Sequence, residues 1–258
     1  MPDTSLQTVD RALAILELLA RHPDGLRPAE IAAAMGLSKV TTYRLLSTLL
    51  SRQFVERQDE SGRYMIGLKV IEISSLRLNN LELKTEAQPW LRQLVNKVGQ
   101  PVHLAIYDQG EIVYIEKVET VHSIRMYSQI GKRSPVYCTA LGKVLLSAMP
   151  DQIVLDLLRQ IDLKPFTPRT LTDPQLILAE VRQARETGYA LDREEHEPGV
   201  FCLAAPIRDY RGQIIAAVST AGGREDFLDD PRSELIIWLK DTAAAISRRM
   251  GFYQENNR

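Results

Sequence analysis

Apolar residues in the first fifty positions recur at the spacing of an amphipathic helix in three stretches. The first, at 6–21, ends before a Pro-Asp-Gly turn. The second, at 29–35, is followed by Gly36, which tolerates the backbone twist of a tight turn. The third begins after Ser38, whose hydroxyl can cap it. The expected apolar stripes of the first two helices are Val9, Leu13, Leu16 and Leu19 or Ala20, and Ile31, Ala34 and Met35.

The third predicted helix separates its side chains into two faces. Between Glu30 and Glu56 the chain has no acidic residue, although it has Lys39, Arg44 and Arg52. A helix that meets DNA phosphates needs this bias, because a carboxylate would repel them. The buried face is predicted to hold Thr42, Leu45, Leu46 and Leu49, and the exposed face Val40, Tyr43, Arg44 and Ser47.

A two-stranded hairpin is predicted directly after this helix. Phe54 and Val55 alternate with polar residues, 59–62 forms a turn, and 63–66 returns as the second strand, with Arg63 near the tip. Helix, turn, helix and hairpin together are typical of a winged helix-turn-helix that binds double-stranded operator DNA. The alternative is a generic small helical domain, since helix-turn-helix patterns give false positives. The predicted DNA contacts are Ser38, Lys39, Val40, Thr41, Tyr43, Arg44, Ser47 and Arg63.

Residues 68–84 are predicted to form a linker helix that is apolar on two sides. Such a surface has to be covered. A partner chain is the favoured cover, because operators are often two-fold symmetric. Packing against the same chain is the alternative. The expected domains are therefore 1–67 for DNA binding, 68–84 as linker and 85–258 as a third region.

The third region has the pattern of an α+β domain. Neighbouring strands with helices gathered around them predict an antiparallel-rich sheet and not a doubly wound fold. The expected helices are 87–98, 140–148, 151–158, 174–187 and 230–251, and the expected strands are 102–106, 112–115, 123–127, 201–207 and 214–221.

The composition is that of an ordinary protein of the cytoplasm. The 258 residues carry a net charge of −1, and no apolar run reaches membrane-spanning length. Up to Ile66 the basic and acidic residues balance, so any positive field of the head must be local. The two cysteines, Cys138 and Cys202, have no metal-binding or paired spacing. Common nucleotide-binding and hydrolase motifs are absent from the sequence, so no cofactor and no enzyme activity are expected.

Two stretches of the third region could recognise a ligand. In 123–143, Thr139 can cap a helix whose first amides would suit a small carboxylate, and Arg125 and Tyr127 could reach the same space. The alternative is a simple cap and a surface arginine. In 192–202, the acidic residues Asp192, Glu194, Glu195 and Glu197 surround His196 and precede Cys202. They could bind a metal or a polar ligand, or form a solvated loop.

The chain resembles the IclR family of bacterial transcription regulators along nearly its whole length. The similar segments are GLSKVTTYRLL (36–46), GRYMIGLKV (62–70), IGKRSPVYCTALGKVLL (130–146) and GYALDREEHEPGVFCLAAP (188–206). The segment around 125–143 is similar to the branch that contains the 2-keto-3-deoxygluconate regulator and other sugar-acid regulators. The resemblance implies a winged helix-turn-helix, a dimerising linker helix and a GAF-like effector-binding domain, with dimers that pair into tetramers.

The resemblance also implies an effector pocket. Helix-start amides carry over to Ala140 and Leu141, and the acid and thiol positions to Asp192 and Cys202. Ser123 and Ser134 are more polar than the walls of glyoxylate-type pockets, which favours a hydroxylated ligand. The full predicted set is Ser123, Arg125, Met126, Tyr127, Ser134, Thr139, Ala140, Leu141, Asp192, Glu195, Val200 and Cys202.

The function predicted from the sequence is a DNA-binding repressor of a sugar-acid or related carbon-source operon. A sugar acid or keto acid would modulate it. Three alternatives stay open: an activator of aromatic-acid or other carboxylate catabolism, a metal-dependent enzyme with a DNA-binding head, and a DNA-bridging protein without a ligand.

Overall fold

The computed structural model describes residues 6–79, 82–119, 128–223 and 233–253. Its contacts divide the chain into two compact units, a head unit (1–80) and a C-terminal unit (81–258). Among the described residues, no helix combines the length and apolarity that a membrane span requires.

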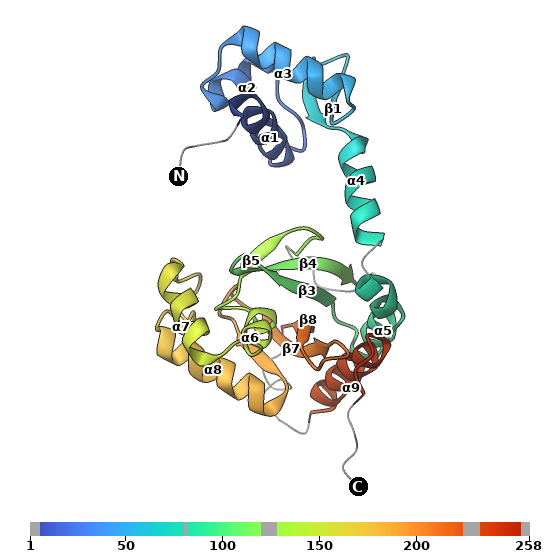
Figure 1. Ribbon diagram of the computed structural model, residues 1–258, viewed down its shortest axis with the longest axis vertical. Helices are drawn as coiled ribbons and strands as arrows, with labels where there is room; N and C mark the ends of the chain where they lie inside the picture. The colour runs from blue at the N-terminus through green and yellow to red at the C-terminus, as the bar shows by residue number, and fades with distance from the viewer. Residues whose placement is uncertain (1–5, 80–81, 120–127, 224–232, 254–258) are drawn as a thin grey trace. The chain divides into compact units, whose positions relative to one another are not determined.

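The head unit is a winged helix-turn-helix, as predicted (Figure 1). Gly36 ends its second helix with φ +62°, a left-handed conformation that favours glycine. A single small core of Ile15, Leu19, Ile31, Leu45, Leu46, Leu49, Val55 and Tyr64 joins the elements. The elements are α1 Gln7–Ala20, α2 Pro28–Met35, α3 Lys39–Ser51, the antiparallel strands β1 Val55–Arg57 and β2 Tyr64–Ile66, and α4 Leu68–Asn79.

The predicted apolar faces of α1 and α2 are partly wrong. Val9 and Leu13 are 52% and 55% exposed, whereas Ile15 and Leu19 are buried. In α2 the buried residues include Ala32, and Ala34 is exposed. Helical spacing fits more than one face in such alanine- and leucine-rich segments, and the packing against α3 and β2 decides between them.

The predicted linker region, 68–84, spans parts of two helices. Helix α4 ends at Asn79, and α5 (Glu82–Val98) begins the C-terminal unit. Leu83 is buried in the core of that unit. Burial of Leu83 therefore assigns the last predicted linker residues to α5.

The C-terminal unit is built on one antiparallel sheet of order β5-β4-β3-β8-β7-β6. It is an α+β unit with an antiparallel sheet, as predicted, and neighbouring strands pair as β3–β4 and β7–β8. The predicted strand 123–127 lies outside the described residues. The strands are β3 Val102–Asp108, β4 Glu111–Val118, β5 Arg133–Pro135, β6 Ala190–Arg193, β7 Phe201–Arg208 and β8 Ile214–Gly222.

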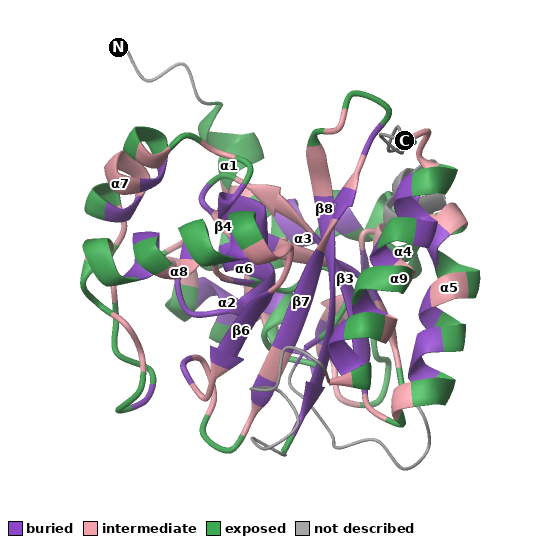
Figure 2. Ribbon diagram, turned by 90° about the horizontal axis from the view of Figure 1, so that it is seen from below, coloured by how far each residue is buried: buried purple, intermediate pink, exposed green. Residues whose placement is uncertain are grey.

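Two hydrophobic cores lie on opposite faces of this sheet, and the strands between them are largely buried (Figure 2). Val102 and Leu104 belong to the core with α5 and α9, whereas Ala105 belongs to the core with α6, α7 and α8. This alternation follows from the two-residue period of a strand. It directs His103, between Val102 and Leu104, toward the α6 side. The helices are α6 Ala140–Leu146, α7 Asp151–Gln160, α8 Pro174–Thr187 and α9 Glu234–Arg249.

Candidate functional site

The N-terminus of α3 is held by Ser38. Its Oγ accepts a hydrogen bond from the Thr41 amide at 3.2 Å, and its carbonyl accepts one from Thr42 Oγ1 at 3.1 Å. Behind this cap, Thr42, Leu45, Leu46 and Leu49 are buried, as predicted. A leucine seam therefore fixes the orientation of α3 in the head.

The opposite side of α3 faces solvent. Val40 is 70% exposed and Tyr43 55%, and Lys39, Arg44 and Ser47 are exposed as well. Thr41 is half-buried, with its Oγ1 2.9 Å from Ser38 Oγ. This surface carries Lys39 and Arg44 and, like the whole segment 31–55, no carboxylate. It can therefore approach a polyanion without repulsion.

Arg63 lies at the start of β2 and is tied to the body of the head. Its Nη1 donates to the carbonyl of Gly25 at 2.7 Å and lies 3.6 Å from Glu30 Oε2. Two other arginines, Arg27 and Arg57, line a cleft with Tyr43 between α2, α3 and the wing. Sequence reasoning did not select them, because they precede α2 and end β1 with no distinctive pattern around them.

A pocket lies on the α6 side of the sheet in the C-terminal unit. Each strand contributes one side chain, because residues on one face of adjacent strands come together. Seven of the eight predicted effector contacts that are described line it, and one of these, Thr139, also caps the helix at its edge. The lining residues are His103, Tyr114, Ser128, Lys132, Ser134, Thr139, Ala140, Leu141, Asp192, His196, Glu197, Val200, Cys202 and Ser219.

The first two residues of α6, Ala140 and Leu141, line this pocket. Thr139 is the cap: its Oγ accepts from the Gly142 amide at 3.1 Å, and its carbonyl accepts from the Lys143 amide at 3.0 Å. The amides of Ala140 and Leu141 precede the first intrahelical bond. Gly142 packs so tightly that a Cβ there would collide with the carbonyl of Val136. The chain thus brings this helix start close to the sheet.

Asp192 is the buried acid of the pocket, only 2% exposed. Its Oδ1 accepts a hydrogen bond from the Glu195 amide at 2.7 Å. Burial raises the pKa of Asp192 to about 7, and the nearby charge of Glu195 adds to the rise. Near neutral pH this carboxyl can therefore either accept a hydrogen bond or donate one.

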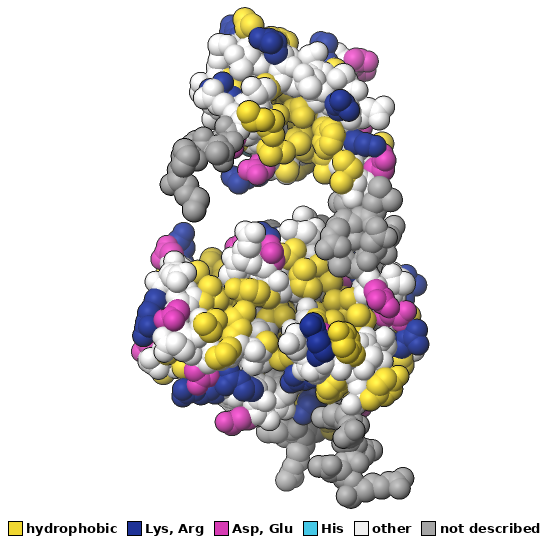
Figure 3. Space-filling model, viewed as in Figure 1, with side chains coloured by type: hydrophobic (Ala, Val, Ile, Leu, Met, Phe, Trp, Pro, Cys, Tyr) yellow, Lys and Arg dark blue, Asp and Glu magenta, His cyan; other side chains and the backbone are white. Residues whose placement is uncertain are grey.

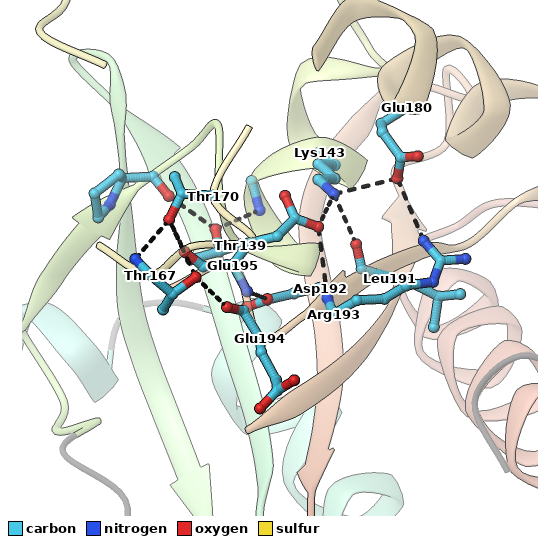
Figure 4. A network of polar contacts seen from close by, with 12 residues as sticks. Thr139, Lys143, Thr167, Thr170, Glu180, Leu191, Asp192, Arg193, Glu194 and Glu195 are labelled. Atoms are coloured by element: carbon cyan, nitrogen blue, oxygen red, sulfur yellow. Dashed lines mark hydrogen bonds and ion pairs between the residues drawn. The ribbon is translucent and has the colours of Figure 1, made fainter. Parts of the chain in front are cut away.

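Glu195 does not line the pocket, contrary to the prediction. Its Oε1 lies 2.5 Å from Nζ of the fully buried Lys143, which also donates to the Leu191 carbonyl at 2.9 Å and to Glu180 Oε2 at 3.2 Å (Figure 4). A buried ammonium needs such partners. The signal for it in the sequence was a single lysine within the apolar run ALGKVLL.

Two threonines fasten the acidic segment from the other side. Thr167 Oγ1 donates to the carbonyl of Glu194, and Thr170 Oγ1 to the carbonyl of Glu195, both at 2.6 Å (Figure 4). The loop 192–200 is thus pinned in the described structure and is not simply solvated. This leaves Asp192 at the pocket wall in a fixed orientation.

His103 and Tyr114 form much of the sheet side of the pocket. Burial lowers the pKa of His103 to about 3, helped by the charge of Lys117, so the imidazole is neutral. Its Nε2 lies 2.7 Å from Ser128 Oγ, and its ring packs edge to face with the ring of Tyr114, with centroids 5.5 Å apart. Burial also raises the pKa of Tyr114, and Ser134 hydrogen-bonds to that phenol. Neither ring stands out in the sequence, since both read as ordinary strand residues.

Of the remaining predicted effector contacts, two line the pocket and four lie outside the described residues. Val200 and Cys202 line the pocket, and burial raises the pKa of the Cys202 thiol, with a further contribution from Asp192. Ser123, Arg125, Met126 and Tyr127 lie outside the described residues. Within the described ranges, no cluster of three or more histidine, cysteine or acidic side chains is arranged to hold a metal ion.

Both units match known families. Residues 8–59 match the family described as "IclR helix-turn-helix domain", and residues 76–248 match "Bacterial transcriptional regulator IclR C-terminal".

Curated relatives match over almost the full length. The chain is 36% identical to the transcriptional regulator XynR of Escherichia coli K12, covering 96% of this chain and 98% of that protein. It is 34% identical to KdgR of the same organism, with coverages of 98% and 95%. Identity to the E. coli K12 transcriptional repressor AllR is 33%, with coverages of 95% and 90%.

Solved structures show the same fold. The Thermotoga maritima IclR structure superposes with a TM-score of 0.81 at 34% identity, covering 96% of this chain and all of that one. An IclR homologue of Microbacterium hydrocarbonoxydans, complexed with 4-hydroxybenzoate, gives a TM-score of 0.82 at 21% identity, with coverages of 95% and 99%. At that lower identity the likeness concerns the fold alone.

Proposed function

Because the chain belongs to the IclR family of bacterial transcriptional regulators, we propose that it represses a sugar-acid or related carbon-source catabolic operon. A small organic acid in the C-terminal unit would relieve or modulate this repression. The name of one relative, the transcriptional repressor AllR, supports the direction of regulation, and the similarity of 125–143 to the sugar-acid regulator branch supports the class of operon. The protein would act in the cytoplasm as a homodimer, or as a tetramer of paired dimers.

On the DNA side, α3 would enter the major groove with its exposed face. Lys39 and Arg44 would supply phosphate and base contacts, with Ser38, Val40, Thr41, Tyr43 and Ser47 beside them. Arg63 would reach the DNA beside the groove only by giving up its hydrogen bond to the Gly25 carbonyl. Arg27 and Arg57, which line the cleft beside α3, would therefore contact DNA phosphates as well. The exposed basic face above a leucine seam supports this assignment.

On the effector side, the carboxylate of the ligand would bind the amides of Ala140 and Leu141. Asp192 and Cys202 would face the rest of the molecule, with Ser134 and Val200 as walls. One observation carries the choice of ligand: all lining side chains except Ala140, Leu141, Val200 and Cys202 are polar or charged. Many hydrogen-bonding side chains around one pocket suit a ligand that carries polar groups along its length, as a sugar acid does.

Regulation requires the acid to bind two arrangements of the protein with different affinity. We propose that binding moves the pinned loop 192–200 against α6 and thereby changes the arrangement of the subunits. The buried Lys143, which contacts both α8 and this loop, is the physical connection between the pocket and the rest of the unit.

The test is a thermal-shift screen of the full chain against sugar acids, keto acids and aromatic acids, followed by gel shifts on the upstream DNA of the regulated operon. A ligand at a hundred times its Kd should stabilise the folded state by about 2.7 kcal/mol. The expected result is stabilisation by a sugar acid and release of DNA by the same compound. Stabilisation by an aromatic acid that strengthens transcription would instead favour the activator alternative.

A further inference from the structure

The floor of the pocket contains a neutral hydrogen-bonding couple that none of the assigned carboxylate contacts uses. His103 comes from the central strand β3, and Ser128 precedes β5. Both line the pocket, and they are 3% and 8% exposed. Their side chains meet at 2.7 Å between Nε2 and Oγ.

The couple is a polar contact in an otherwise apolar layer. His103 is the second residue of β3, and its neighbours Val102 and Leu104 belong to the hydrophobic core on the other face of the sheet. Burial of a polar group is unfavourable unless its hydrogen bonds are made, and Ser128 supplies one for His103. The rings of His103 and Tyr114 pack edge to face, with centroids 5.5 Å apart and an interplanar angle of 62°.

The chemistry of the couple differs from that of the helix start. The amides of Ala140 and Leu141 only donate, which matches a carboxylate. A neutral imidazole and a hydroxyl can each donate and accept, which matches a ligand hydroxyl that does the same. A carboxylate can use only the donors of such a pair, whereas a ligand hydroxyl can use a donor and an acceptor together.

We infer that His103, together with Ser128, is the specificity determinant that recognises a hydroxyl group on the carbon chain of the effector. The inference rests on the proposed acid-binding function of this pocket and adds the residues that recognise a hydroxyl, with at least one hydroxyl of the acid directed at β3. Because the imidazole is uncharged, this recognition works through hydrogen bonds and not through attraction of the carboxylate.

A site built to bond a hydroxyl discriminates against an analogue without it, since its own polar groups are then left unpaired. For one such group the expected discrimination is about tenfold to a hundredfold in Kd. Ligands that lack hydroxyls should lose nothing when the couple is removed.

The experiment measures Kd by calorimetry on the full chain with gluconate, xylonate and 2-keto-3-deoxygluconate, and with hexanoate and pentanoate as chains without hydroxyls. His103→Leu should weaken the best hydroxylated acid by about tenfold or more and leave hexanoate unchanged or tighter. His103→Asn, which keeps a donor and an acceptor, should recover part of the loss. Ser128→Ala, a smaller change in side-chain volume, should also weaken binding of the hydroxylated acid. The test therefore does not depend on whether His103→Leu folds. Ser147→Ala is the matched control, because Ser147 is also buried but bonds to the Val144 carbonyl outside the pocket.

The outcomes separate the two proposals. If the wild-type chain binds hydroxylated acids and His103→Leu and Ser128→Ala weaken all acids equally, or none, the couple has only a structural role and the inference is wrong. If the wild-type chain prefers hexanoate, the acid-binding function stands and the inference falls. If it binds no acid in the panel, the effector part of the proposed function fails and the inference fails with it.

Discussion

The exposed face of α3 and the pocket of the C-terminal unit use their side chains in opposite ways. Val40 and Tyr43 are more than half exposed, and the seam behind them holds the helix without their help. Asp192, His103 and Ser134 are all at most 3% exposed, and the pocket shares its acidic loop with a buried ion pair. Changes on α3 should therefore alter DNA binding and leave the fold intact, whereas changes around the pocket should affect folding and ligand together.

The apolar surface of the head marks a third kind of region. Figure 3 shows hydrophobic side chains gathered on one face of the head unit. On α1, Val9 and Leu13 line a groove with Leu16, Leu45 and Phe54. An exposed apolar groove can serve as a protein–protein interaction site. It accords with the homodimer proposed above, since a partner chain would cover it.

The largest effect should follow from breaking the buried ion pair. Lys143→Met leaves Glu195 buried without its cation, which should cost about 3–5 kcal/mol of unfolding free energy. Both tryptophans, Trp90 and Trp238, lie in the C-terminal unit, so their fluorescence during denaturation reports that unit alone. A loss below about 1 kcal/mol would mean that the pair is hydrated in solution.

The matched control for that measurement is the double variant Lys143→Met with Glu195→Leu. Removal of both charges should recover much of the loss, because no unpaired charge then remains. Arg44→Ala, in the head, should shift the same fluorescence transition by no more than about 0.5 kcal/mol. A large shift for Arg44→Ala would contradict the contrast between the two regions.

The contrast also explains how far the sequence could predict each region. In the head, the Ser38 cap and the seam from Thr42 to Leu49 are local patterns, and both were predicted correctly. The buried side of α1 was not, because packing against α3 and β2 selects it. The pocket combines β3, β4, β7 and β8, so His103 and Tyr114 gave no local signal. Glu195 was misassigned, since Lys143 is fifty-two positions away in the chain.

The titration of Asp192 should be detectable in the pH dependence of the unfolding free energy. Its native pKa of about 7 lies above the ordinary value of 3.8, so the native state retains a proton that the unfolded state has lost. Stability from this group is therefore present at low pH and is lost as pH rises from about 4 to about 7. The slope is at most about 1.4 kcal/mol per pH unit for one proton.

His103 acts in the opposite direction. Its pKa falls from 6.5 to about 3, so its contribution is present above pH 6.5 and is lost as pH falls. In the wild-type protein the two contributions to the pH dependence of the unfolding free energy therefore partly cancel. Asp192→Asn keeps an acceptor for the Glu195 amide but cannot titrate. Its stability relative to wild type, from tryptophan fluorescence at pH 5 and pH 8, should improve at the higher pH. An unchanged difference would show that Asp192 ionises normally.

Arg44→Ala should weaken operator binding by about 1–3 kcal/mol, roughly fivefold to 150-fold, if Arg44 contacts a base. The reason is its exposed position on the acid-free face of α3. Gel shifts at several salt concentrations measure both the affinity and its salt slope. Arg21→Ala, an equal change of charge at the exposed end of α1, is the control. Equal losses for both variants would reduce the role of Arg44 to net charge.

The smallest effect should come from the cap of α3. Ser38→Ala removes the acceptor of the Thr41 amide and should cost the head about 1 kcal/mol. The head contains no tryptophan, so hydrogen exchange of the α3 amides in the full chain is the appropriate measurement. Exchange within 39–51 should accelerate about fivefold, while the strands of the C-terminal unit keep their rates. Ser47→Ala, an exposed residue of the same helix, should leave α3 as protected as before or slightly more, because alanine is the better helix former. If Ser38→Ala changed the exchange of the C-terminal strands as well, the stability of α3 would not be local, and the independence of the DNA-binding surface from the rest of the fold would have to be abandoned.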